Sequence, residues 1–184
     1  MQYRTLGFSG LKISVIGLGT WAIGGGDWKF GWGDQDEQEA IDTIVRAVEL
    51  GINWIDTAAI YGEGRSEVLV AKAMRQISAA ARPFIATKCG RVALGNGEIG
   101  KCLRRESVIA ECDGSLKRLQ TDCIDLYQLH WPEPDEEIDR AGRHSWIFSS
   151  RARCVTSASQ ITLSVRWRAC RKSPRSYLCN RRTA

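Results

Sequence analysis

The sequence predicts an α/β fold, in which short apolar strands form a parallel sheet and amphipathic helices connect them. Strands are expected at 14–19, 52–56, 84–88 and 123–130, and each of the three gaps between them contains a stretch with helical periodicity. The residues at the expected strand ends, Thr20, Asp56, Lys88 and His130, are spaced 36, 32 and 42 residues apart, which is the length of one βα unit. Such a repeat fits a (β/α)8 barrel or a doubly wound sheet, both with right-handed crossovers.

The individual elements follow from local patterns. The segment YRTLGFSGLKISVIG predicts a small hairpin with Gly10 near its turn. A helix is expected over 36–51, because apolar residues share one face, acids occupy the first turn and Gly51 ends the pattern. Similar patterns predict helices over 66–77 and 105–120. The order of elements is therefore a hairpin followed by about four βα units.

Length and composition favour one soluble domain. The 184 residues include no long apolar stretch of the kind a signal peptide or membrane helix needs, so a cytoplasmic protein without a membrane partner is expected. The seven cysteines form no C-x-x-C motif, which favours reduced thiols over a disulfide framework. The two histidines do not stand at metal-ligand spacing from a cysteine pair, and no metal is expected.

The charge distribution changes abruptly near Asp139. All 21 Asp and Glu lie at or before this residue, whereas 140–184 contains 11 of the 26 Lys and Arg and no acid. The sequence therefore divides into an α/β part over 1–139 and a basic tail over 140–184.

A glycine motif follows the first expected strand. GLGTWA, residues 17–22, fits the pattern G-x-G-x-x-A of dinucleotide-binding Rossmann folds. That fingerprint requires a helix to begin at its second glycine, and here helical periodicity begins only near Asp36. A Rossmann reductase stays an alternative, although this mismatch argues against it.

Four ionisable side chains gather at one predicted edge. Asp56, Lys88 and His130 each end a strand, and Tyr61 lies in the loop after Asp56. In a parallel βα array the carboxyl ends of the strands share one face, where a barrel builds its active site. Each residue alone has a structural explanation as a cap, an ion-pair partner or a packed ring. Their coincidence at one edge is what favours a catalytic site.

These four groups, called the tetrad below, suit proton transfer to a carbonyl oxygen. A phenol is a poor acid at neutral pH, but an adjacent ammonium such as that of Lys88 favours its ionised form. Asp56 would keep the ammonium charged and in place. The ring N–H of His130 could orient or polarise the carbonyl.

The motifs GLGTW, DTAAIYGEGRSE, IATKCG and SLKRLQTDCIDLYQLHWP resemble the signature blocks of the aldo-keto reductase superfamily, in order and at its spacing. The resemblance covers nearly all of 1–139. It implies the N-terminal half of a (β/α)8 TIM barrel that reduces small-molecule aldehydes and ketones with NADPH. It also implies Tyr61 as proton donor, Asp56 and Lys88 as its tuning pair, and His130 as the substrate-orienting residue. The implied cofactor contacts are Gly19, Thr20, Trp21 and Asp56.

The resemblance stops after WPEPDEEIDRA. The family continues with a helix and a strand close to GKVRYIGVSN, whereas this tail has no acids and no helical periodicity. Permitted codons for 147–168, read from one base earlier, give DLQQQGKVRYIGVSNYSVGQM. The same shift over 178–184 permits LQPPYS, which again resembles the family. The loss of one T at an Ala-Trp junction, GCT TGG, would explain Ala141-Gly142.

A frameshift, natural or artefactual, is thus favoured over a basic tail that binds nucleic acid. The expected molecule is a half-barrel fragment with a complete tetrad, no reductase activity of its own and no nucleic-acid partner. The tail is expected to lack a stable fold. Open strand edges predict aggregation or association with chaperones. The alternatives are a short enzyme with a replaced second half, a Rossmann reductase and a nucleic-acid-binding protein.

Overall fold

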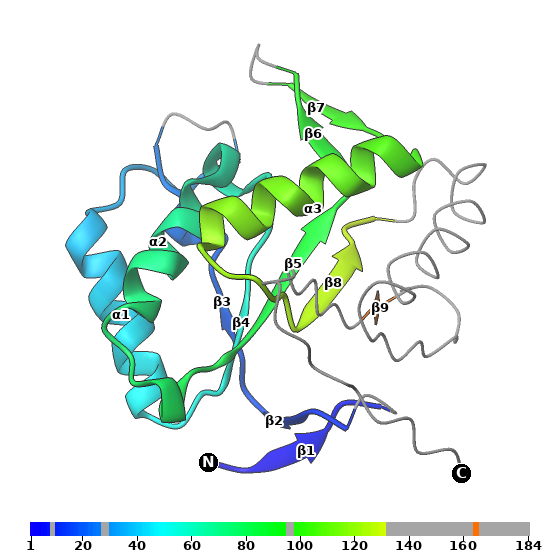
Figure 1. The fold of residues 1–184 in the computed structure, drawn as a ribbon. Helices are drawn as coiled ribbons and strands as arrows, with labels where there is room; N and C mark the ends of the chain where they lie inside the picture. Colours follow the sequence, from blue (N-terminus) through cyan, green and yellow to red (C-terminus); the bar gives the residue numbers. More distant parts are fainter. Residues whose placement is uncertain (8–9, 27–29, 95–97, 132–163, 166–184) are drawn as a thin grey trace, which may run out of the picture.

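A parallel sheet forms the centre of the computed structural model, which describes residues 1–7, 10–26, 30–94, 98–131 and 164–165 (Figure 1). Its parallel strands lie in chain order, so each new strand adds to the same side of the sheet. They are β3 (Leu18–Gly19), β4 (Trp54–Asp56), β5 (Phe84–Cys89) and β8 (Leu126–Leu129). The short β9 (Ser164–Val165) pairs antiparallel with β8. The predicted α/β fold with a parallel sheet is confirmed.

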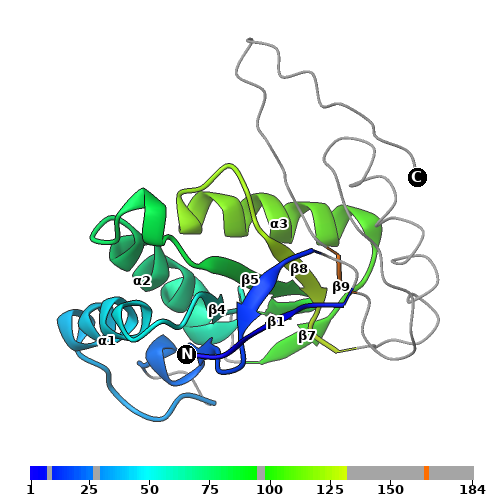
Figure 2. The same cartoon turned by 90° about the horizontal axis from the view of Figure 1, so that it is seen from below.

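A helix connects each parallel strand to the next. The helices are α1 (Glu37–Glu49), α2 (Arg65–Met74) and α3 (Arg105–Leu119), and they pack along one face of the sheet (Figures 1 and 2). The Asp36 side chain caps α1 by accepting the backbone N–H of Glu39 at 2.9 Å. The ends of α1 and α3 lie within two residues of the predicted spans, whereas α2 begins one residue before its predicted span and ends three residues before the predicted end. No helix begins at Gly19, because only a short 3₁₀ turn, η1 (Ala22–Gly24), separates β3 from the loop before α1.

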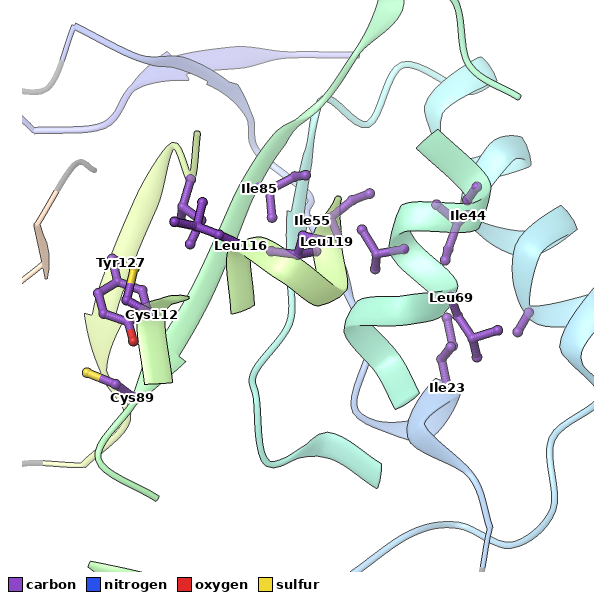
Figure 3. Packing of buried hydrophobic residues seen from close by; sticks show 14 of the residues in the cluster. Ile23, Ile44, Ile55, Leu69, Ile85, Cys89, Cys112, Leu116, Leu119 and Tyr127 are labelled. Atoms are coloured by element: carbon purple, nitrogen blue, oxygen red, sulfur yellow. The ribbon is translucent and has the colours of Figure 1, made fainter. Parts of the chain in front are cut away.

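The core lies between these helices and the sheet. Ile44 of α1 and Leu69 of α2 are buried against strand residues such as Ile55 and Ile85 (Figure 3). Burying an aliphatic side chain of this size contributes about 1.5–3 kcal/mol relative to exposure. This packing fixes the helices on the strands, and thereby fixes the loops that leave the strand ends.

Two antiparallel hairpins flank the sheet at opposite ends (Figure 1). The N-terminal hairpin pairs β1 (Tyr3–Thr5) with β2 (Lys12–Ser14), as expected from the sequence. The second hairpin pairs β6 (Arg91–Ala93) with β7 (Ile99–Lys101), beyond the carboxyl end of β5, and was not predicted. The remaining 3₁₀ turns are η2 (Tyr61–Gly64) and η3 (Ala79–Ala81).

The strand expected over 14–19 is interrupted. Ser14 belongs to the hairpin, where its backbone N–H donates to the Asn53 side chain at 2.7 Å and its hydroxyl donates to the Ile16 carbonyl at 2.7 Å. These contacts turn the chain, so the parallel strand begins only at Leu18. The apolar segment over 14–19 is therefore divided between the end of β2 and the strand β3.

The expected boundary near Asp139 lies outside the described residues, as does the basic tail apart from β9. Among the residues that the structure describes, no helix is long and apolar enough to cross a membrane.

Candidate functional site

The loop that carries Tyr61 starts at the end of β4 and packs against η1. Gly24 and Gly62 meet backbone to backbone: a Cβ added at Gly24 would stand 2.9 Å from the Gly62 nitrogen. Gly62 also has a φ of 56°, which is unfavourable for other residues. Two glycines are therefore needed for the loops after β3 and β4 to approach closely. This contact holds Tyr61 over the carboxyl ends of the strands.

The Lys88 ammonium joins three groups of the site. Its Nζ donates to Asp56 Oδ2 at 2.7 Å, to the Thr57 carbonyl at 2.9 Å and to the Tyr61 hydroxyl oxygen at 3.2 Å. The Lys88 side chain is 12% exposed and that of Asp56 is 31% exposed. A lysine with one carboxylate, one carbonyl and one phenol oxygen has an acceptor for each of its three N–H bonds. The ammonium is therefore fixed against the phenol.

His130 follows β8 and faces the same phenol. Its ring lies edge-on to Tyr61, with ring centroids 5.5 Å apart and an angle of 82° between the rings. Its backbone N–H donates to the Cys89 carbonyl at 2.9 Å, which anchors it to the end of β5. Burial, together with the nearby positive charges of Lys88 and Arg91, lowers the pKa of His130 to about 4. The imidazole is therefore neutral at pH 7 and carries one N–H donor.

The structure thus brings all four tetrad residues to one edge of the sheet, from the ends of β4, β5 and β8 and the loop after β4. Their roles in catalysis stay predictions. Among the described residues, no group of three or more His, Cys, Asp or Glu is arranged to hold a metal ion.

The residues predicted to contact a cofactor lie beside the tetrad. Gly19 pairs in register with Asp56 at the sheet edge, and a Cβ added there would meet nothing within 4 Å. Trp21 is 46% exposed and stacks on Tyr61, with centroids 6.2 Å apart and the rings 15° from parallel. Thr20, in contrast, is fully buried, and its hydroxyl donates to the Asp56 carbonyl at 3.1 Å. These contacts stay predictions, and for Thr20 the side chain is engaged within the protein.

A further group near the mouth of the site was missed by sequence reasoning. The Arg91 guanidinium lies 4.5 Å from the centre of the Trp131 ring. The backbone before it is held by Glu111, whose Oε2 accepts the Gly90 N–H at 2.9 Å. Burial raises the pKa of this carboxyl to about 7. The turn residues in GNGEIG could have indicated the β6–β7 hairpin that begins at Arg91, but no sequence signal marks the contact with Glu111.

Comparison with known proteins agrees with this geometry. Residues 15–152 match the aldo/keto reductase family. The chain belongs to the aldo/keto reductase family. The resemblance drawn from the sequence motifs is therefore confirmed.

Two curated aldo/keto reductase relatives illustrate the match. The aldo-keto reductase YhdN of Bacillus subtilis is 44% identical over 134 residues, which cover 73% of this chain and 39% of the relative. The NADH-specific methylglyoxal reductase of Escherichia coli is 43% identical over 140 residues, covering 71% of this chain and 42% of the relative. The chain thus spans less than half the length of either protein.

Solved aldo-keto reductase structures resolve the choice of architecture. The holo form of AKR11C1 from Bacillus halodurans superposes with a TM-score of 0.70 at 32% identity, covering 82% of this chain and 47% of that one. The order β3–β4–β5–β8 with intervening helices thus corresponds to about half of a TIM barrel. The Rossmann alternative is wrong, and so is the doubly wound sheet.

The aldo/keto reductase family uses NAD(P)H, and the residues present fit part of such a cofactor. Gly19 leaves open space at the sheet edge, and Trp21, two residues later in the chain, has a partly exposed ring. A planar nicotinamide can stack on an aromatic ring, and an edge without side chains permits its close approach. The described residues therefore fit the nicotinamide end of the cofactor.

Proposed function

We propose that residues 1–139 form the proton-transfer half of an NADPH-dependent carbonyl reductase that acts on small aldehydes and ketones. The observation that carries this proposal is the contact of the Lys88 ammonium with both Asp56 and Tyr61. A phenol beside a fixed cation is a suitable acid for an oxygen that gains negative charge during reduction.

The proposed division of roles follows from hydrogen-bond direction. Lys88 donates to the Tyr61 oxygen, so the proton that Tyr61 can deliver is its own, and the phenolate left behind is stabilised by the ammonium. Asp56 keeps Lys88 charged and in place. The neutral His130 can donate its ring N–H to the same carbonyl oxygen and orient it toward Tyr61. Bound NAD(P)H supplies the hydride.

NADPH is the proposed cofactor, with Gly19, Trp21 and Asp56 near its nicotinamide. Thr20 holds Asp56 in place through the hydrogen bond from its hydroxyl to the Asp56 carbonyl. The Escherichia coli relative is named as NADH-specific, which makes NADH the alternative to test. The contacts that choose between the two cofactors involve the adenosine phosphate, for which the described residues offer no candidate.

The proposed activity requires the other half of the barrel. Positioning of reactants can account for about 7–11 kcal/mol of a barrier, so a tetrad without a complete cofactor site should give no measurable turnover. We propose that 140–184 is read out of frame, and that the in-frame protein is a cytoplasmic enzyme. Sequencing the gene across codons 135–150 tests this point, because a frameshift requires a second open frame that encodes the missing strands.

A fusion protein tests the function directly. The fusion barrel consists of residues 1–131 of this chain, followed by the Bacillus subtilis relative from the position that aligns with residue 132 to its C-terminus. We expect it to reduce 4-nitrobenzaldehyde with NADPH, whereas the 184-residue chain and the added part alone do not. An inactive but folded fusion barrel that binds NADPH would contradict the proposed function. Robust activity of the 184-residue chain would contradict the need for the other half.

A further inference from the structure

Three buried threonines stand at or near the carboxyl ends of the parallel strands. All three are fully buried: Thr20 and Thr57 directly follow β3 and β4, and Thr87 lies in β5, two residues before its end. Each is next in sequence to a residue of the candidate site, since Asp56 precedes Thr57 and Lys88 follows Thr87. Successive side chains of a strand point to opposite sides. The hydroxyls of all three threonines contact Ser66 or Glu67 of α2, so they face the helix layer, while Asp56 and Lys88 face the site.

Ser66, in the first turn of α2, forms hydrogen bonds with two of these threonines. The Ser66 oxygen lies 2.9 Å from the Thr20 carbonyl, 2.8 Å from the Thr20 hydroxyl and 3.0 Å from the Thr57 hydroxyl. A serine has one proton to donate, so donation to the Thr20 carbonyl leaves its oxygen to accept from a threonine. Ser66 is itself fully buried. It therefore ties the ends of β3 and β4 to one point on α2.

The third threonine is held by the next residue of the same helix. Glu67 is fully buried, and its carboxylate accepts from the Thr87 hydroxyl at 2.6 Å and from Arg118 Nε at 2.7 Å. A buried carboxylate is tolerated only when charge and hydrogen bonds compensate it, and Arg118 of α3 supplies the charge. Glu67 thereby fixes β5 at the residue before Lys88.

We propose that Ser66 and Glu67 are positioning residues. By holding the carboxyl-terminal parts of β3, β4 and β5 in fixed positions relative to α2, they place the Lys88 ammonium against Asp56 and Tyr61. Two of the three Lys88 acceptors, the Asp56 carboxylate and the Thr57 carbonyl, lie on the segment that Ser66 holds, while Lys88 itself adjoins the threonine held by Glu67. The Ser66–Glu67 pair thus acts on both sides of the ion pair. The consequence for catalysis rests on the proposed function.

The test uses Thr87→Val, which removes the hydroxyl that Glu67 holds but keeps the side-chain shape, and Ser66→Ala. His130 reports on the position of Lys88 without a cofactor, since the nearby ammonium helps to lower its pKa. NMR titration of ¹³C-labelled histidine in the 184-residue chain should show a higher His130 pKa in both variants. Thr87→Ser should restore the original titration. Thr43→Val, the same change at an exposed position of α1, is the matched control and should leave it unchanged.

The same variants are then compared in the fusion barrel. We expect kcat to fall roughly ten- to a hundredfold with KM and the NADPH Kd nearly unchanged, because a displacement of about 1 Å can cost a hundredfold. If the 184-residue chain aggregates, the titration is recorded on the fusion barrel. Folded variants with an unchanged His130 titration would overturn the proposal, even if their stability fell. An inactive parent fusion barrel would instead count against the proposed function, and the titration would still decide the role of the Ser66–Glu67 pair.

Discussion

His130 shows how the site controls charge at the scale of a single residue. Its ring stands near two cations, Lys88 and Arg91, and is largely removed from water. Both conditions disfavour a third positive charge. The imidazole consequently stays neutral where a solvent-exposed histidine would be partly protonated, and it keeps an N–H donor directed by its contacts with Tyr61 and the end of β5.

The first prediction concerns this titration. The pKa of His130 should be about 4, compared with 6.5 for an unperturbed histidine. Because the unfolded chain binds this proton near pH 6.5 and the folded chain only near pH 4, the folded state should lose stability as the pH falls between these values. The C2 resonance of His130 measures the pKa directly. Arg91→Gln should raise it, whereas Arg46→Gln on the exposed face of α1 should not. A wild-type value near 6.5 would show that the ring is solvated and not held at the phenol.

At the scale of elements, the loops that leave β3 and β4 decide where the proton donor stands. Their backbones touch at Gly24 and Gly62, so neither loop can shift without the other. Trp21 stacks on Tyr61 from the first loop, and this adds an aromatic contact to the backbone contact. The site is therefore built from two loops that act as one unit.

The second prediction tests that contact. Gly62→Ala should destabilise the fusion barrel by about 1–3 kcal/mol and lower its kcat, because the new methyl group would overlap the Gly24 backbone. Gly10→Ala is the matched control: Gly10 also has a positive φ, of 69°, but a Cβ there meets nothing within 4 Å. Thermal unfolding and steady-state kinetics of both variants separate the contact from the backbone strain. Equal effects of the two substitutions would argue against a special role for the contact.

The sequence predicted elements well where one local pattern decides them. Helix periodicity located α1, α2 and α3, and apolar runs located strands whose ends bring Asp56, Lys88 and His130 together. It could not reveal contacts between distant segments, such as the meeting of Gly24 with Gly62. Nor did it single out Glu67, an acid in the first turn of α2 that is fully buried against Arg118. Such contacts depend on tertiary packing and not on local sequence.

At the scale of the whole molecule, the described sheet is open. β3 forms one edge, and at the other side β9 pairs with two residues of β8. A closed barrel has no edges, whereas an open parallel sheet leaves unpaired backbone groups that other chains can pair with. Val15 and Ile16, just before β3, are also about half exposed.

The third prediction follows from these edges. The 184-residue chain should associate as its concentration rises into the micromolar range, or co-purify with chaperones, whereas the fusion barrel should stay dispersed. Size-exclusion chromatography with light scattering over a concentration series measures this difference. A monodisperse monomer that melts cooperatively would mean that the open edges are satisfied within the chain.

The most direct test of the account is the effect of Tyr61→Phe on the fusion barrel. The substitution removes the phenol proton and keeps the ring that stacks on Trp21 and faces His130. Binding of NADPH, followed by quenching of protein fluorescence, should be retained, while kcat for 4-nitrobenzaldehyde should fall about a hundredfold or more, as expected when a general acid is lost. A Tyr61→Phe fusion barrel that turns over as fast as its parent would contradict the assignment of Tyr61 as proton donor.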